Sequence, residues 1–290
     1  NDIFTGRNQR PLGDVNQSMR IIGDRGYIVV NNSGKVEVVD TATLASIATI
    51  EGMPSPRYIR RVNGNKAYVT DFKFPGIHII DLATLQRTGA IPVRGRTEQM
   101  AQLGNKVFVT NYRNLSDTLV APKVLVIDAT TDQVIDSVLL TEGPNSLGFD
   151  FINRLWVLCD GGVFPKLEAG ALHRINPESH QLEASLPFPN QADIPTKMQF
   201  NTAANKLYYL NSGVWSMDIN TGVLEVQPVI DGTGQTFYGL GIAPFTDDIW
   251  VGEAADFVQR GTVIRYSAQG TELSRYEVGV APSHFTFNTP

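Results

Sequence analysis

Polar and aromatic side chains recur at the start of successive repeats of one pattern, and these residues carry the chemistry with which the chain could bind a ligand. The set is Gln17, Arg57, Tyr58, Glu98, Asn145, Lys197, Phe237 and Tyr238. Amide and charged groups bind through hydrogen bonds and ion pairs, whereas aromatic rings offer apolar faces. A repeated scaffold that varies at these positions predicts recognition of an asymmetric ligand.

A second set follows the next strand of several repeats. Its members are Asp71, Phe72, Asn111, Tyr112 and Asn211. Exposed aromatic rings beside polar groups suit a flat, amphipathic ligand. Asn and Asp at strand ends are equally common as turn residues, so each position has a structural interpretation as well.

The sequence contains no catalytic or metal-binding signature. Its four histidines lack a ligand spacing such as H-x-x-x-H, and no G-x-S-x-G nucleophile motif is present. We therefore expect no catalytic residues, no metal and no cofactor. An alternative is a calcium-dependent lactonase or lyase, with oxygen ligands from Asp71, Asn111, Asn211 and Glu253.

The element that must position these residues is a repeated β-strand. Lys66–Asp71, Lys-Ala-Tyr-Val-Thr-Asp, returns forty residues later as Lys106–Asn111, Lys-Val-Phe-Val-Thr-Asn. A period near 40 residues, with four short strands per unit, is typical of a β-propeller blade. Asp40, Asp81, Asp128 and Asp218 end a later strand of their repeats, where we predict that the carboxylates form turns.

The repeat count predicts an all-β, seven-bladed β-propeller with four-stranded antiparallel blades. The apolar position of the first strand has seven members, of which the last, Phe285, has no strands after it. Asn1–Phe4 resembles an outer strand, so we expect both termini to build a closing blade that lacks two strands in this chain. Six blades with two additional strands is the alternative.

We expect a single propeller domain over residues 1–290. The predicted blades are 14–55, 56–95, 96–142, 143–190, 191–231 and 232–279, with a closing blade from 280–290 and 1–10. Insertions at 111–118, 160–167 and 255–260 lengthen loops on the face that carries the polar set. Insertions of this kind usually gather on a binding face.

Composition excludes several classes of function. With 24 Lys and Arg against 29 Asp and Glu, the net charge is −5, so nucleic acid is not an expected partner. No apolar run approaches the roughly 20 residues that span a membrane. The single cysteine, Cys159, lies in an apolar run and is predicted to be buried and inert. We expect a monomer.

The two repeated runs resemble the YVTN repeat of bacterial surface-layer β-propellers, also called YncE-like. Leu12–Met19, Val29–Ser33 and Ser55–Ile59 are similar to the surface lipoprotein branch of Bacteroides-type bacteria. Blade 4 departs from the repeat, with Cys159-Asp160 where YVTN would end and Asn176-Pro177 in place of the Asp turn.

The resemblance implies a seven-bladed lipoprotein at the cell surface, anchored to the outer membrane by a segment outside this chain. One group in that branch captures cobalamin and passes it to an outer-membrane transporter. The corresponding expectation is a non-enzymatic, extracytoplasmic protein that binds cobalamin or a related corrinoid. A protein-docking scaffold remains an alternative alongside the enzyme.

Overall fold

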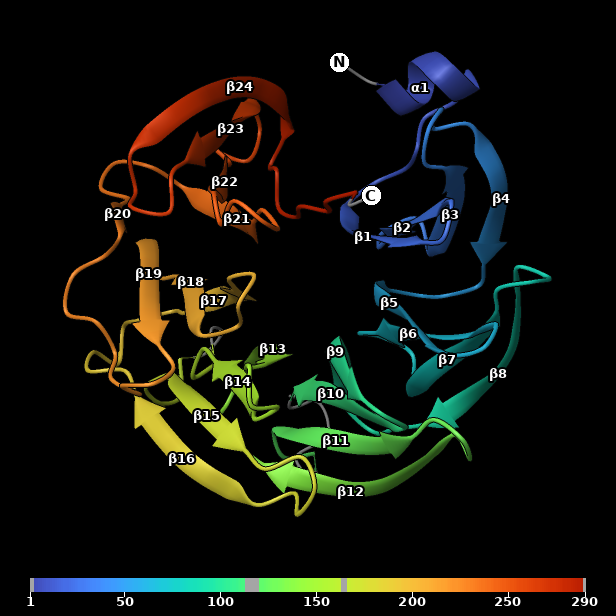
Figure 1. The fold of residues 1–290 in the computed structure, drawn as a ribbon. Coiled ribbons are helices and arrows are strands. Elements are labelled where there is room, and N and C mark those ends of the chain that lie inside the picture. The colour runs from blue at the N-terminus through green and yellow to red at the C-terminus, as the bar shows by residue number, and fades with distance from the viewer. Residues whose placement is uncertain (1–2, 113–119, 163–165, 289–290) are drawn as a thin grey trace. The chain divides into compact units, whose positions relative to one another are not determined.

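Antiparallel β-strands form almost all of the chain, which a computed structural model describes for residues 3–112, 120–162 and 166–288 (Figure 1). The chain divides into two compact units, Asp2–Leu139 and Leu140–Pro290, here called the N-terminal and C-terminal units. Each unit contains three four-stranded sheets, or blades, whose strands pair in sequence order.

The N-terminal unit contains one short helix and blades 1 to 3. Its elements are α1 (Ile3–Asn8), β1 (Asn16–Ile22), β2 (Arg25–Val30), β3 (Lys35–Asp40), β4 (Ser46–Glu51), β5 (Pro56–Asn63), β6 (Lys66–Asp71), β7 (Gly76–Asp81), β8 (Gln86–Pro92), β9 (Arg96–Leu103), β10 (Lys106–Tyr112), β11 (Lys123–Asp128) and β12 (Gln133–Leu139).

The C-terminal unit contains blades 4 to 6. Its strands are β13 (Pro144–Phe149), β14 (Leu155–Cys159), β15 (Ala171–Ile175), β16 (Leu182–Pro187), β17 (Thr196–Phe200), β18 (Lys206–Leu210), β19 (Gly213–Asp218), β20 (Ile230–Asp231), β21 (Phe237–Ile242), β22 (Ile249–Glu253), β23 (Arg260–Tyr266) and β24 (Glu272–Val280).

The middle strands of each blade are the apolar ones because both of their faces are covered. β10 and β11 are buried almost along their whole length, whereas the outermost strand β12 is mostly exposed. Neighbouring blades within a unit share one hydrophobic core: Tyr27 and Val38 of blade 1 pack with Ile59 and Val69 of blade 2. Runs of Val, Ile and aromatic residues therefore specify strands that are sandwiched between blades.

The predicted aspartate turns are confirmed. The Asp40 carboxylate accepts hydrogen bonds from the backbone N–H groups of Ala42 and Thr43. Asp81, Asp128 and Asp218 accept from the residue two positions on in the same way. These carboxylates close the turn between the third and fourth strands, which is a structural role.

The prediction of seven blades is wrong, because the structure contains six four-stranded antiparallel sheets and is a six-bladed β-propeller. The repeat count overestimated the number because residues 3–8 and 281–288 do not form strands, although the sequence near both termini has strand-like composition. At the N-terminus, Ile3–Asn8 is helical and outside any sheet. Asn8 holds this helix against blade 1 by donating to the Leu44 carbonyl and accepting from the Ser46 N–H.

Residues 281–288 at the C-terminus, here called the C-terminal tail, form no strand. Pro282 has no N–H group to donate to a sheet. The tail nevertheless lies against β21 and β22, where a Cβ on Gly239 or Gly252 would collide with Pro282. Within both units the first strand of a blade contacts the first two strands of the blade before it, as β5 contacts β1 and β2. The tail therefore occupies the position of a first strand without pairing as one.

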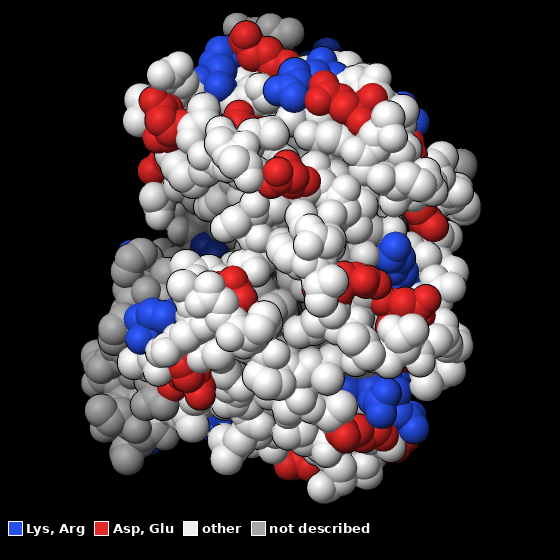
Figure 2. Space-filling view, turned by 90° about the vertical axis from the view of Figure 1, so that its left-hand side faces the viewer, with Lys and Arg blue, Asp and Glu red and all other residues white. Residues whose placement is uncertain are grey.

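Acidic and basic side chains are interspersed with uncharged ones over the face shown in Figure 2. Cys159 is buried and has a free thiol, as predicted, and burial raises its pKa well above the usual value. Within the described part of the chain, no helix is long and apolar enough to cross a membrane.

Candidate functional site

The first set of predicted binding residues lies at a shared irregularity of the backbone. In all six blades the pairing of the first and second strands shifts register near the start of the first strand. Such a β-bulge bends the strand and changes the direction of its side chains. The residues within or beside these bulges are Gln17, Arg57, Tyr58, Glu98, Asn145, Lys197, Phe237 and Tyr238.

The threonine of the repeated Val-Thr-Asp/Asn run fixes the bulge in two blades. The Thr70 hydroxyl accepts the Tyr58 N–H at 3.1 Å, and the Thr110 hydroxyl accepts the Gln99 N–H at 2.9 Å. A bulge leaves a backbone donor without its ladder partner, and a buried donor must find another acceptor. The repeated Val-Thr-Asp/Asn run therefore specifies the second strand, and its threonine also stabilises the bulged start of the first strand.

Arg57 and Glu98 form a two-bond ion pair between blades 2 and 3. Arg57 Nε and Nη2 donate to the Glu98 carboxylate at 2.6 and 2.9 Å, and the guanidinium carbon lies 4.2 Å from the Phe72 ring centre. Burial alone would lower the pKa of Arg57, but Glu98 raises it above its usual value. Both side chains are charged, and together they have no net charge.

Aromatic rings surround this pair. Phe72 packs edge-on against Tyr112, with ring centres 5.6 Å apart. Tyr58 is half-buried, and burial together with the negative charge of Glu98 raises its pKa to about 12. Gln99 donates to the Tyr58 hydroxyl at 3.4 Å, and Gln17 also hydrogen-bonds to it. We call Gln17, Arg57, Tyr58, Phe72, Glu98, Gln99 and Tyr112 the Arg57 cluster.

Asp71 and Asn111 have structural partners. The buried Asp71 carboxylate accepts the N–H groups of Ser55, Lys73 and Phe74 and lies 3.2 Å from His78 Nε2. Burial would raise its pKa, but these bonds lower it. Asn111 donates to the Arg94 carbonyl at 2.9 Å.

The C-terminal unit contributes a smaller aromatic group. The Lys197 ammonium lies 5.5 Å from the Tyr238 ring centre, and Tyr238 packs edge-on against Phe257 with ring centres 5.0 Å apart. Both rings are substantially exposed, at 40% and 49%. Lys197 adopts a left-handed backbone conformation, with φ of 59°.

The other predicted residues of this unit are committed to the fold. Asn145 donates to the Pro195 carbonyl at 2.9 Å and accepts from Ser146 at 2.7 Å. Asn211 accepts the Ile194 N–H at 3.2 Å. Phe237 packs against the core that blades 5 and 6 share.

Asp160 directly follows the second strand of blade 4, whereas Asp71 is the last residue of the second strand of blade 2. The Asp160 carboxylate has fewer donors than that of Asp71. It accepts the Gly162 N–H at 2.8 Å and a long bond of 3.5 Å from Asn145. Burial raises its pKa to about 6. A carboxyl with this pKa changes charge near neutral pH.

Three of the four oxygen donors named for the calcium alternative are engaged in the fold. Asp71, Asn211 and Glu253 already accept backbone N–H groups; Glu253 accepts that of Ala255 at 2.9 Å. No group of three His, Cys, Asp or Glu side chains suitable for a metal is found among the described residues.

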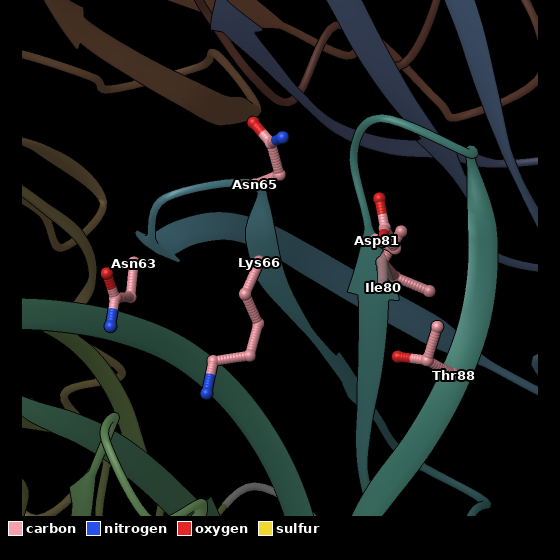
Figure 3. Close-up of a pocket in the computed structure, with 6 residues that line it drawn as sticks. All are labelled: Asn63, Asn65, Lys66, Ile80, Asp81 and Thr88. Carbon is pink, nitrogen blue, oxygen red and sulfur yellow. The ribbon is translucent and has the colours of Figure 1, made fainter.

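A cavity of about 380 Å³ lies at the opposite end of the blade 2 strands (Figure 3). Its lining consists of Asn63, Asn65, Lys66, Ile80, Asp81 and Thr88. Lys66 points away from Asp81 and Thr88 in Figure 3 and pairs with Asp132 at 2.6 Å. Asp81 accepts the N–H groups of its own turn. This open, polar hollow lies outside the predicted site.

The structure thus brings together six predicted residues in the N-terminal unit and two in the C-terminal unit. The six are Gln17, Arg57, Tyr58, Phe72, Glu98 and Tyr112, and the two are Lys197 and Tyr238. Sequence reasoning did not include Gln99 and Phe257 in the site. Gln99 directly follows Glu98, and Phe257 lies in the insertion at 255–260, so both positions carried a signal.

Six four-stranded blades with bulged first strands define the class of the protein: it is a β-propeller. A family model described as a domain of unknown function, DUF5074, matches residues 1–288, and the chain belongs to this family. No curated protein matches the chain.

Solved structures of similar fold come from several sources. Hydrazine synthase of Kuenenia stuttgartiensis has a TM-score of 0.73 at 12% identity, covering 92% of this chain and 88% of that one. A quinonprotein alcohol dehydrogenase-like protein of Bacteroides thetaiotaomicron has a TM-score of 0.71 at 17% identity, covering 95% and 70%. The computationally designed Ika8 protein has a TM-score of 0.65 at 14% identity, covering 94% and 78%. At these identities the likeness concerns the fold alone.

Proposed function

We propose that the chain is a non-enzymatic binding protein that holds a small amphipathic ligand on the Arg57 cluster. The supporting observation is the arrangement of Tyr58, Phe72 and Tyr112 around the Arg57–Glu98 ion pair. Aromatic faces gain from burying apolar ligand surface, while a few fixed polar groups orient the ligand.

The cluster favours ligand groups that hydrogen-bond without net charge. Arg57 is neutralised by Glu98, and the remaining polar groups are the Gln17 and Gln99 amides and the Tyr58 hydroxyl. Tyr58 stays protonated at neutral pH because its pKa is about 12. These groups complement amides and hydroxyls of a ligand better than carboxylates or ammonium groups.

A corrinoid is the specific ligand that we propose. The chain resembles the surface lipoprotein branch that includes cobalamin-capturing members, and a corrinoid combines a broad flat ring with peripheral amides. On the same basis we propose an extracytoplasmic location at the cell surface and an outer-membrane transporter as partner. The 255–260 insertion suits contact with such a partner, since Val258 is 79% exposed and Phe257 is 49% exposed.

Titration with cyanocobalamin, followed by heat and by the visible spectrum, tests this proposal. The wild-type protein should bind at micromolar concentration or below. Tyr112→Ala should weaken binding about tenfold, because a stacked aromatic contact contributes about 1 kcal/mol or more. Phe245→Ala, which removes a ring that is 76% exposed in the other unit, is the matched control and should bind normally.

Two outcomes separate the ligand from the site. Absence of binding at micromolar concentration would remove the corrinoid assignment. Binding that survives Tyr112→Ala unchanged would instead place the corrinoid away from the Arg57 cluster and overturn the proposed site.

A further inference from the structure

The first strands of the N-terminal unit carry far more positive than negative charge. The charged residues of β1, β5 and β9 are Arg20, Arg57, Arg60, Arg61, Arg96 and Glu98. The single carboxylate of these strands is held by Arg57 in a two-bond ion pair. The other arginines must therefore be neutralised from elsewhere or remain as uncompensated cations.

Arg20 and Arg60 occupy the same position in neighbouring blades. Arg20 lies opposite Tyr27 in the β1–β2 pair, and Arg60 lies opposite Tyr68 in the β5–β6 pair. Strands β1 and β5 contact each other, so the two arginines are at the same level of adjacent strands. The corresponding residue of blade 3 is Ala101, which carries no charge.

The guanidinium group of Arg60 is fixed but not neutralised. Its Nε donates to the Met100 carbonyl at 3.0 Å, and no carboxylate of the described residues forms an ion pair with Arg20 or Arg60. Burial and the charge of Arg20 lower the pKa of Arg60 to about 10. Arg60 is half-buried, and burial also lowers the pKa of Arg20. Part of the Arg20 side chain is nevertheless exposed to solvent, so a small ion can reach the pair.

We propose that Arg20 and Arg60 form a binding site for an oxyanion, such as a phosphate or carboxylate group. Two guanidinium groups at one level offer several N–H donors, and their planar geometry matches the oxygens of both groups. An oxyanion would supply the negative charge that the neighbouring strands lack. The bond to Met100 holds Arg60 in place before the ion arrives, which lowers the entropic cost of binding.

The oxyanion site is separate from the Arg57 cluster. Arg60 follows Arg57 by three residues on a strand, a distance of about 10 Å. Arg57 is already paired, so it does not compete for the ion. The proposal therefore holds whether or not a corrinoid binds.

Calorimetric titration of the whole chain with inorganic phosphate and with acetate, each against sodium chloride at equal ionic strength, tests the site. The wild-type protein should bind at least one of the two oxyanions, and the stronger response identifies the preferred group. Arg60→Gln and Arg20→Gln should each weaken that binding by about tenfold or more, because each removes a charged donor. Arg61→Gln, one residue further along β5, is the matched control and should bind as the wild type does.

Thermal unfolding gives an independent measurement. Phosphate stabilises many proteins by exclusion from their surface, so the relevant quantity is the difference between variants. Phosphate should raise the melting temperature of Arg60→Gln less than that of Arg61→Gln, because only Arg61→Gln retains the stabilisation that comes from phosphate binding at the site. In chloride alone, Arg60→Gln should be at least as stable as the wild type, because it removes one of two neighbouring like charges.

If the wild-type protein gave the same heat of titration with phosphate, acetate and chloride, the proposed site would be overturned. So would full phosphate binding in both Arg60→Gln and Arg20→Gln. If one of these variants does not fold, the other still decides the question.

Discussion

The first strands of the two units share a bulged backbone geometry but differ in their content of charged residues and glycine. Those of the N-terminal unit hold five arginines and one glutamate. Those of the C-terminal unit, β13, β17 and β21, hold Lys197 as their one charged residue and contain Gly148, Gly239 and Gly241. Both sets are bulged at the start. The same bulge thus presents polar chemistry in one unit and permits close packing in the other.

The difference continues in the second strands. Thr70 and Thr110 hold the bulges of blades 2 and 3, whereas Leu158, Leu210 and Gly252 take the equivalent position in blades 4 to 6. None of these three side chains offers a hydroxyl acceptor. The N-terminal unit therefore fixes its bulges more firmly, which suits a preorganised binding surface.

The largest expected effect is on the ion pair of the N-terminal unit. Glu98→Gln leaves the mostly buried Arg57 without a counterion and should lower the free energy of unfolding by about 3 kcal/mol. Urea denaturation measures the change. The double variant Arg57→Gln/Glu98→Gln should recover most of the loss, because it leaves no unpaired charge. Equal losses in the single and double variants would show that the pair does not act as a unit.

In the C-terminal unit the comparable test is steric. Gly252 lies directly under Pro282 of the tail, so Gly252→Val should cost about 2 kcal/mol through overpacking. Gly279→Val is the matched control, since a Cβ there meets no atom within 4 Å. In a chain that ends at residue 280, the cost of Gly252→Val should disappear. A cost that persists without the tail would refute this packing.

The sequence predicted the parts of the fold that depend on local patterns. Runs such as Lys66–Asp71 appeared as strands, and Asp40 and Asp81 formed the expected turns, because strand composition and carboxylate turns are properties of a few adjacent residues. The blade count failed at the termini. The tail follows the pattern of a first strand up to Phe285, yet the described residues contain no strand that pairs with it in a ladder.

The site was only partly predictable for a related reason. Side-chain identity marked Arg57 and Glu98 as polar positions, but their pairing depends on which strands lie side by side and on the register shift between Pro56 and Ile59. Arg20 and Arg60 directly follow Met19 and Ile59, which belong to the seven-member apolar position of the first strands. Their charges indicate an anion site only when the structure shows that no carboxylate of the neighbouring strands pairs with them.

Asp71 and Asp160 lie at the ends of the second strands of blades 2 and 4, and the stability of the protein should respond with opposite signs when they are mutated. The pKa of Asp160 is about 6 in the folded chain against an ordinary value of 3.8, so its stabilising contribution exists below about pH 4 and is lost as the pH rises through 6. Asp160→Asn should therefore raise stability by about 1 to 2 kcal/mol at pH 7.5 and by much less at pH 4. Asn31 stands at the equivalent position of blade 1, where its N–H donates to Val15 as that of Asp160 donates to Gly143, so the substitution fits this backbone.

Asp71 provides the matched contrast. Its pKa is lowered in the folded chain, so its contribution exists above about pH 4 and is lost as the pH falls. Asp71→Asn should destabilise the protein at pH 7.5, and the loss should shrink on acidification. Denaturation curves of both variants at several pH values measure these changes. An increase in stability in Asp71→Asn, or a decrease in Asp160→Asn, at pH 7.5 would contradict the contrast between the two units.

The smallest expected effect concerns the threonines that hold the bulges. Thr70→Val keeps the shape of a fully buried side chain but removes the acceptor for the Tyr58 N–H, which should cost about 1 kcal/mol. Thr88→Val, at an exposed hydroxyl with a long 3.4 Å contact, should change stability little and serves as the control. Because Tyr58 belongs to the Arg57 cluster, Thr70→Val should also weaken ligand binding more than its stability loss alone would explain. Unchanged affinity in a destabilised Thr70→Val protein would mean that the bulge supports the sheet without positioning the binding surface.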